Sequence, residues 1–299
     1  MVRFIAYGAV QMIPYDMFVD DLEKIALEKA GELFRSSVER SMLEKTLRGM
    51  RRLFRRPHLI VLCGCGGTGK TTAAAFLAGR LNRENHDGTY EVSNSLEKFR
   101  LDHAAKVGVE VVPGQLHLRK EAWRKVLPRL QRTRTTPLII NVVSWGYHAI
   151  ADDQLLGFSQ YERSGILGSA ERYAESRRAA ELVDLHELSA YVLLLKRDVR
   201  MITLVAKQDL WWESRPEVKS HYVSADNDYR KAINSLRDRM GAEHFRHEFC
   251  SVSFGRISHR DPAERVIFST AGGYDDKIQN ANLRNFQSII SGMYDEPPI

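Results

Sequence analysis

The chain has 299 residues, with a hydrophobic content of 43%, a charged content of 27% and a formal net charge of +6. This composition is ordinary for a globular protein, and the length suffices for one enlarged domain or for a domain with an appendage. No basic run is interleaved with aromatic residues, so the sequence indicates no nucleic-acid partner, and no apolar stretch reaches the roughly 18 residues of a membrane span. The three cysteines, Cys63, Cys65 and Cys250, have no metal-ligand spacing, and we expect reduced thiols in a cytoplasmic protein.

Residues 1–57 are predicted to form an amphipathic helical extension. Apolar residues between Leu22 and Phe54 recur at spacings of three and four, and Pro57 ends the pattern. The stretch Arg48–Arg56 carries five arginines and no acidic residue. We expect these cations to favour the helix C-terminus while the apolar stripe packs on the main domain. The alternative is a basic amphipathic surface that makes weak peripheral contact with an anionic membrane or with a partner.

Residues 58–299 are predicted to form an α/β domain, because apolar strands alternate with helices as a parallel sheet requires. The segment at about 147–200 is predicted to be a long, mostly helical insertion. The expected strands are 58–63, 97–103, 107–112, 137–143, 201–205 and 248–254, with a further edge strand at 266–270. The expected helices are 72–81, 119–132, 226–240 and 275–293.

A glycine-rich loop follows the first of these strands. Residues 64–71 read Gly-Cys-Gly-Gly-Thr-Gly-Lys-Thr and satisfy the phosphate-binding pattern Gly-x-x-x-x-Gly-Lys-Ser/Thr between a strand and a helix. Its backbone N–H groups and the helix N-terminus favour phosphate, Lys70 would reach the outer phosphates, and Thr71 would ligate Mg²⁺. We therefore predict a nucleoside triphosphate site with Mg²⁺ as cofactor, formed by Gly64, Cys65, Gly66, Gly67, Thr68, Gly69, Lys70, Thr71 and Thr72.

Three later segments extend this pattern. Val109–Gln115 reads Val-Glu-Val-Val-Pro-Gly-Gln, Ala206–Asp209 reads Ala-Lys-Gln-Asp, and Cys250–Val252 reads Cys-Ser-Val. With these segments, residues 58–290 resemble the Ras-like small GTPases, including the Arf-type and signal-recognition-particle-receptor branches. In that family the corresponding elements are Asp-x-x-Gly-Gln, Asn/Thr-Lys-x-Asp and a Cys/Ser-Ala-type turn. The resemblance implies a P-loop NTPase fold with a six-stranded, mostly parallel sheet and helices on both faces.

The resemblance also implies a guanine pocket. Asp209 would accept hydrogen bonds from guanine N1–H and from the exocyclic amine, and adenine offers no such pair of donors. A buried carboxylate left without partners is costly, so Asp209 would select against ATP. Lys207 would lie along the base, and Ser251 with the Val252 N–H would contact the guanine carbonyl. Ala206 replaces the family's Asn or Thr, which we expect to weaken affinity without removing selectivity.

For hydrolysis, the resemblance implies that the Gly114 N–H meets the γ-phosphate and that Gln115 orients the attacking water, so Gln115 and Lys70 are the predicted catalytic residues. The family's Mg²⁺-shell aspartate falls on Val111, and Glu110 beside it would point to the opposite face of the sheet. Either metal affinity is lower or another acid, such as Asp102, substitutes. The switch hydroxyl that closes over Mg²⁺ is expected within residues 89–95, the candidates being Thr89, Ser93 and Ser95.

The sequence therefore favours a GTP/GDP-binding molecular switch that hydrolyses GTP slowly and works with a protein effector or an arginine-supplying activating partner. One alternative is a GTP-binding scaffold without useful hydrolysis, which Val111 favours and Gln115 opposes. The other is an ATP-using P-loop enzyme, which Asp209 opposes.

Overall fold

The computed structural model describes residues 58–79, 95–100, 107–149, 166–255, 259–260 and 266–295. The chain divides into two compact units, Met1–Gly49 and Met50–Ile299, and all described residues belong to the second. The predicted helical extension with its Arg48–Arg56 stretch lies outside the described residues, as do Thr89, Ser93 and Asp102. None of the described helices is both long and apolar enough to cross a membrane.

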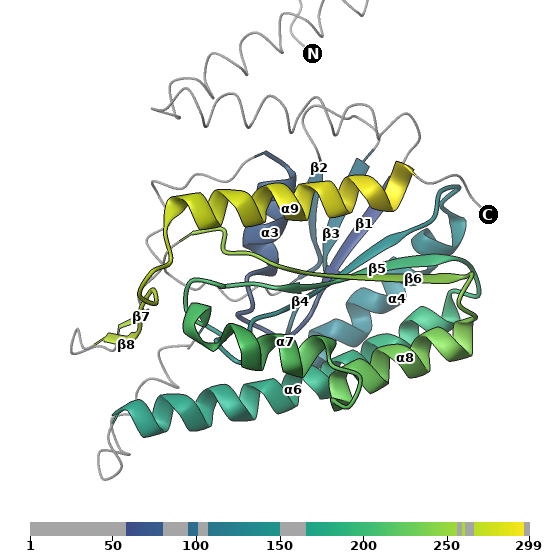
Figure 1. The fold of residues 1–299 in the computed structure, drawn as a ribbon. Coiled ribbons are helices and arrows are strands. Elements are labelled where there is room, and N and C mark those ends of the chain that lie inside the picture. The colour runs from purple at the N-terminus through teal and green to yellow at the C-terminus, as the bar shows by residue number, and fades with distance from the viewer. Residues whose placement is uncertain are drawn as a thin grey trace, which may run out of the picture. The chain divides into compact units, whose positions relative to one another are not determined.

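A six-stranded sheet forms the centre of the second unit (Figure 1). Its strands are β1 (His58–Cys63), β2 (Glu97–Arg100), β3 (Val107–Val111), β4 (Leu138–Val143), β5 (Val199–Val205) and β6 (Phe245–Ser251). They lie in the order β2-β3-β1-β4-β5-β6, and every neighbouring pair is parallel except β2 with β3. The predicted six-stranded, mostly parallel sheet is therefore confirmed.

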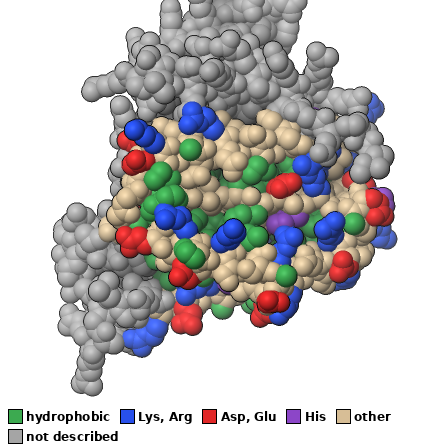
Figure 2. Space-filling view, viewed as in Figure 1, with side chains coloured by type: hydrophobic (Ala, Val, Ile, Leu, Met, Phe, Trp, Pro, Cys, Tyr) green, Lys and Arg blue, Asp and Glu red, His purple; other side chains and the backbone are tan. Residues whose placement is uncertain are grey.

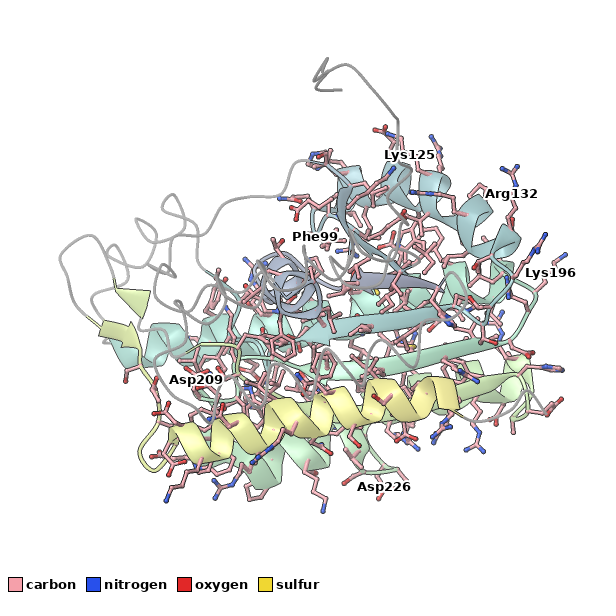
Figure 3. The ribbon with its side chains drawn as sticks, turned by 90° about the horizontal axis from the view of Figure 1, so that it is seen from above. Phe99, Lys125, Arg132, Lys196, Asp209 and Asp226 are labelled. Carbon is pink, nitrogen blue, oxygen red and sulfur yellow. The ribbon has the colours of Figure 1, made fainter. Side chains whose placement is uncertain are left out.

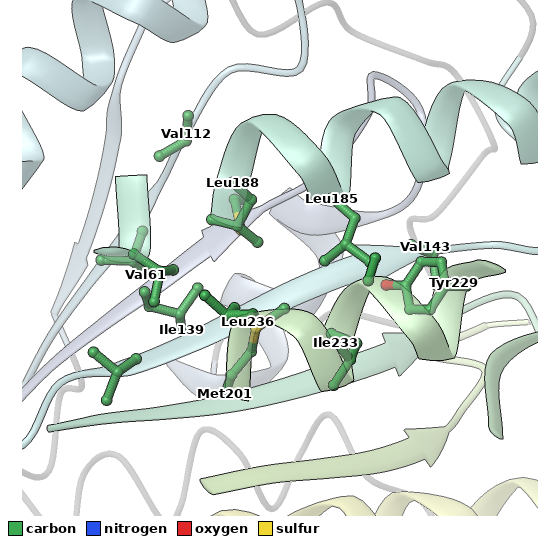
Figure 4. Packing of buried hydrophobic residues seen from close by; sticks show 14 of the residues in the cluster. Val61, Val112, Ile139, Val143, Leu185, Leu188, Met201, Tyr229, Ile233 and Leu236 are labelled. Carbon is green, nitrogen blue, oxygen red and sulfur yellow. The ribbon is translucent and has the colours of Figure 1, made fainter. Parts of the chain in front are cut away.

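Helices cover both faces of this sheet, as predicted (Figure 1). One face packs against α3 (Lys70–Leu77) and α9 (Asp276–Asp295), with Ile60 and Phe286 in the shared core. The other packs against α4 (Leu116–Arg132), α6 (Ile166–Leu194), α7 (Arg215–Val223) and α8 (Asp228–Met240), with Val61 and Leu185 in the core (Figure 4). Because successive residues of a strand face opposite sides, the apolar run of β1 serves both cores.

One expectation about the later part of the chain is refined and one needs correction. The helix α6 joins β4 to β5, which are parallel neighbours, so the described part of the segment at about 147–200 contains the crossover helix that such a pair requires. The expected edge strand at 266–270 is instead β8 (Val266–Phe268), which pairs with β7 (His259–Arg260) in a separate two-stranded sheet.

The C-terminal end of α4 is fixed by an arginine that precedes β5. Arg197 Nη1 donates to the carbonyl oxygens of Leu130 and Thr133 at 2.8 and 2.6 Å, and its Nη2 donates to that of Thr135 at 2.9 Å. These are carbonyls at or just beyond the end of the helix, where no intrahelical donor is left for them.

On the face shown in Figure 2, acidic and basic side chains are interspersed over the described surface.

Candidate functional site: a nucleotide-binding edge of the sheet

The glycine loop turns tightly between β1 and α3. Gly64 has φ 129°, and a Cβ there would lie 2.1 Å from the carbonyl oxygen of Val142 on β4. Gly69, which precedes α3, has φ 97° and offers no side-chain cap to the first turn of the helix. Only glycine combines such dihedral angles with so close an approach of two backbones. Because the first N–H groups of a helix have no intrahelical acceptor, the start of α3 can bind an anion.

Lys70 folds back over this loop. Its Nζ donates to the Cys65 carbonyl at 2.6 Å, and the Thr68 hydroxyl donates to the same oxygen at 3.1 Å. Burial lowers the pKa of Lys70 to about 8. The ammonium is thus held above the loop, where it can meet phosphate oxygens.

The cysteines of this region are free thiols, as expected, and so is Cys250. Burial raises the pKa of Cys63 to about 12 and that of Cys65 to about 11. Both thiols therefore stay protonated at neutral pH and are poor nucleophiles.

Thr71, the predicted Mg²⁺ ligand, is exposed, and its hydroxyl donates to Glu97 Oε2 at 3.2 Å. The sequence analysis did not identify Glu97. The nearby candidate Ser95 is exposed and lies just before β2. Glu110 lies on the other face of the sheet, where it forms an ion pair with Arg129 of α4.

The turn after β3 packs directly on the glycine loop. A Cβ on Gly114 would lie 2.3 Å from the Gly66 nitrogen and 2.7 Å from the carbonyl carbon of Cys65. Arg119 of α4 donates to the Gly114 carbonyl at 2.7 Å. The Oε1 of Gln115 is buried and accepts no hydrogen bond from any described residue. A buried amide oxygen in that state costs about 1–3 kcal/mol unless a ligand or water donates to it.

Arg119 also links this turn to α6. It forms ion pairs with Asp184 and with Glu187, the latter at 3.0 Å. The arginine is 7% exposed, so both pairs are well shielded from water. The turn, the first part of α4 and the middle of α6 are therefore held together.

The predicted base-binding residues lie at the same edge of the sheet as the loop. A Cβ on Gly69 would lie 3.9 Å from the Ala206 Cβ, so the segment after β5 contacts the phosphate loop. Figure 3 shows Asp209 at the opposite end of the sheet from Lys196 and Arg132. Asp209 is 2% exposed, and its carboxylate accepts from the hydroxyls of Ser253 at 2.5 Å and Thr270 at 3.3 Å.

Lys207 lies two residues before Asp209 in the chain and has φ 56°. Its Nζ is buried and has no hydrogen-bond partner among the described residues. Burial lowers the pKa of Lys207 to about 7, although Asp209 and Glu181 act in the opposite direction. A negatively charged ligand near the Lys207 Nζ would favour the ammonium form and raise this pKa again.

The prediction for Val252 is wrong. Its N–H donates to the Val205 carbonyl at 3.0 Å and so continues the pairing of the strands, which leaves it unavailable to a base. The Ser251 hydroxyl accepts from Gln208 Nε2 at 2.9 Å, which leaves its own hydrogen available to donate, so its contact with the base stays a prediction. Ser253, which donates to Asp209, was missed by the sequence analysis.

A buried glutamate of α6 organises the segment after β4. Glu181 accepts from the backbone N–H of Ser144 at 2.8 Å, from His148 Nε2 at 2.9 Å and from the Tyr222 hydroxyl at 2.5 Å. Burial raises the pKa of Glu181, but these hydrogen bonds outweigh it and the net shift is downward. The carboxylate is therefore ionised, and it fixes the segment in place.

That segment forms one side wall of the site. The Ala149 N–H donates to the Gly67 carbonyl at 2.9 Å, and a Cβ on Gly67 would lie 2.6 Å from the same nitrogen. Beside it lies a cavity of about 560 Å³ lined by the glycine loop, Gly114, Gln115 and α6. His148 is 2% exposed and belongs to this wall.

No protein-family model and no curated protein matches this chain. Solved structures resemble it at low identity. The signal recognition particle receptor SRb-GDP-Mg from Chaetomium thermophilum is 11% identical, with a TM-score of 0.42 over 79% of this chain and 99% of the other.

Two further structures are similarly distant. Small COPII coat GTPase SAR1 from Encephalitozoon cuniculi, in complex with GDP, is 15% identical, with a TM-score of 0.37 over 80% of this chain and 85% of the other. Toc33 from Arabidopsis thaliana is 10% identical, with a TM-score of 0.40 over 87% and 93%.

Proposed function

We propose that the chain binds GTP and GDP together with Mg²⁺, hydrolyses GTP slowly and acts as a molecular switch. The observation that carries this proposal is the buried carboxylate of Asp209 at the same edge of the sheet as the glycine loop. A phosphate loop alone accepts any nucleotide, whereas a buried carboxylate beside it favours a base with adjacent N–H donors.

Base recognition is assigned to Asp209 and to the turn that begins at Ser253. The hydroxyls of Ser253 and Thr270 orient the carboxylate, and a carboxylate can accept more than two hydrogen bonds. We expect the turn Ser253–Gly255 to face the guanine carbonyl in place of the Val252 N–H, which is used in strand pairing. Lys207 would lie along the base with its buried ammonium toward the loop.

The phosphates would lie in the cradle formed by Gly64, Gly67 and Gly69, with Lys70 over the outer phosphates. Thr71 and a nearby carboxylate offer hard oxygen ligands, which suit Mg²⁺. When bound, the cation neutralises charge on the phosphate oxygens. The residues of this chain thus fit both the nucleotide and the metal.

For hydrolysis, Gly114 would donate its N–H to the γ-phosphate and Gln115 would orient the attacking water. The buried Oε1 of Gln115, which has no donor among the described residues, supports this role. Leu116 and Val183 line the adjacent cavity and are 62% and 68% exposed, which is high for large apolar residues. They support a protein partner at this place. We expect that partner to supply an arginine to the cavity, because hydrolysis by this route is accelerated by such a group.

A GTP-binding scaffold without useful hydrolysis is the second candidate, because Val111 occupies the position of the family's metal-shell aspartate. Measuring turnover of the Gln115→Leu variant separates the two. Loss of GTP turnover supports the switch, whereas unchanged turnover supports the scaffold.

Nucleotide preference tests the main proposal. Displacement of a fluorescent GDP analogue by GTP, GDP, ATP and xanthosine triphosphate should show guanine selectivity, and Asp209→Asn should shift the preference toward xanthosine. The matched control is Asp226→Asn, since Asp226 is exposed and lies away from Asp209 (Figure 3). Equal displacement by ATP and GTP would refute guanine recognition and leave an unspecific triphosphate site.

A further inference from the structure

The side chain of Val111 leaves the expected metal position without a carboxylate. Val111 is fully buried in the core that β3 shares with α3 and α9. The Val111 side chain nevertheless lies on the face of the sheet that α3 covers. Another acid must therefore reach the same place if the metal site is to contain a carboxylate.

The register of the sheet supplies one. In the antiparallel pair of β2 and β3, Glu97 lies directly opposite Val111. Directly opposed residues of an antiparallel pair have their side chains on the same face, with Cβ atoms about 4.5–5.5 Å apart. Phe99, two residues along β2, packs on the core of that face together with Val111, which agrees with this orientation. Glu97 is thus the cross-strand neighbour of the missing aspartate.

The contact of Glu97 is as informative as its position. Its Oε2 accepts from the hydroxyl of Thr71, the residue of the glycine loop whose type ligates Mg²⁺. Its negative charge also acts on Lys70, the residue that precedes Thr71. Among the described residues, Glu110 is the other acid near Val111, and it is excluded because it pairs with Arg129 on the opposite face.

We propose that Glu97 supplies the carboxylate of the Mg²⁺ site, on β2 in place of the family's aspartate on β3. The proposal rests on the proposed function, since Mg²⁺ bound at such sites is shared between one or two carboxylates and substrate phosphates. The donor set is a hydroxyl from Thr71, a carboxylate from Glu97 and the phosphates. The carboxylate ligand would thus come from β2 and not from the neighbouring β3, whereas the phosphate loop keeps the family's pattern.

The test compares wild type with Glu97→Gln in the full-length protein. This substitution disturbs the structure little, because the amide oxygen that it introduces can still accept from the Thr71 hydroxyl, so only the negative charge and the metal ligation are lost. The affinity for a fluorescent GDP analogue is measured in EDTA and at increasing Mg²⁺, and binding of Mn²⁺ to the GDP complex is followed by electron paramagnetic resonance.

Wild type should bind GDP more tightly with Mg²⁺ than in EDTA. The variant should keep the affinity measured in EDTA and lose about 10- to 100-fold in affinity for Mn²⁺ or Mg²⁺ in the GDP complex. Glu97→Asp should recover part of this loss. Glu175→Gln, which removes an exposed acid of α6, is the matched control and should match wild type.

Equal Mn²⁺ affinity in wild type and Glu97→Gln, with GDP bound in both, would overturn the assignment of Glu97 and leave the proposed function standing. A chain that binds no guanine nucleotide at all would refute the proposed function itself. A uniform loss of GDP affinity in EDTA and in Mg²⁺ would also overturn the assignment, because it would indicate damage to the loop and not to the metal site.

Discussion

Binding of a nucleotide should be accompanied by proton uptake at Lys70. In the free protein, burial lowers the pKa of Lys70 to about 8, so the amine is largely neutral above that pH. A phosphate beside Nζ favours the ammonium and raises the pKa again. Affinity is therefore close to its full value at pH 7 and falls as the pH rises through 8, since the free amine must first take up a proton.

The size of the effect follows from this shift. Raising the pH from 7 to 8.5 should weaken GDP binding about fourfold, or about 0.8 kcal/mol, if Lys70 is fully protonated in the complex. Over the same range, the proton uptake due to Lys70 should rise from about 0.1 to about 0.8 per GDP bound.

Isothermal titration calorimetry in two buffers of different ionisation enthalpy measures this uptake directly. GMP is the matched ligand, because it keeps the base but lacks the outer phosphate that Lys70 would contact. Uptake at pH 8.5 that is equal for GDP and GMP, or absent for GDP, would refute the placement of Lys70 against the outer phosphates.

Three further predictions concern the surroundings of the site. Gly114→Ala places a Cβ 2.3 Å from the Gly66 nitrogen, so the turn must move away, and competition binding should show a loss of GTP affinity relative to GDP; Gly292→Ala, whose Cβ meets nothing within 4 Å, should leave the ratio unchanged. Glu181→Gln puts amide hydrogens against groups that donate to the carboxylate, so urea unfolding should show a loss of about 3–5 kcal/mol in the free energy of unfolding. A loss under about 1 kcal/mol would contradict the role of Glu181 in fixing the segment after β4. Burial, helped by a neighbouring arginine, lowers the pKa of His247 to about 3, so only the unfolded chain protonates this group as the pH falls below the usual pKa near 6.5. The free energy of unfolding should therefore fall by about 2 kcal/mol between pH 7 and pH 5. The His247→Gln variant should show a flatter dependence on pH, and an unchanged slope would show that other groups cause it.

The fold could be predicted largely from local patterns. The apolar run that ends at Cys63, the glycine loop and the start of α3 follow one another in the chain, so the strand, turn and helix were all visible in one short window. The crossover role of α6 was not, because it depends on β4 and β5 being neighbours, and the sequence does not state which strands pair.

The site was predictable only where its residues belong to a contiguous motif. Lys70 and Asp209 each belong to such a motif, whereas the role proposed for Glu97 depends on the register between two strands. Ser253 was missed because the end of β6 was placed too far along the chain, and a shift of that boundary changes which residues remain available beyond the strand. Glu181 lies in the middle of a long helix, where a lone acid looks like any surface residue until its donors are known.

Two arginines anchor the two ends of α4, and in the proposed switch they would govern how a movement at the nucleotide spreads. Arg119 fastens the beginning of the helix to Gly114 and α6, and Arg197 fastens its far end to the segment before β5. A helix anchored at both ends cannot pivot freely about one of them. A displacement of Gly114 would therefore move α4 as a rigid body relative to α6. The outward side of these two helices is where a partner molecule would distinguish the two nucleotide states of the proposed switch.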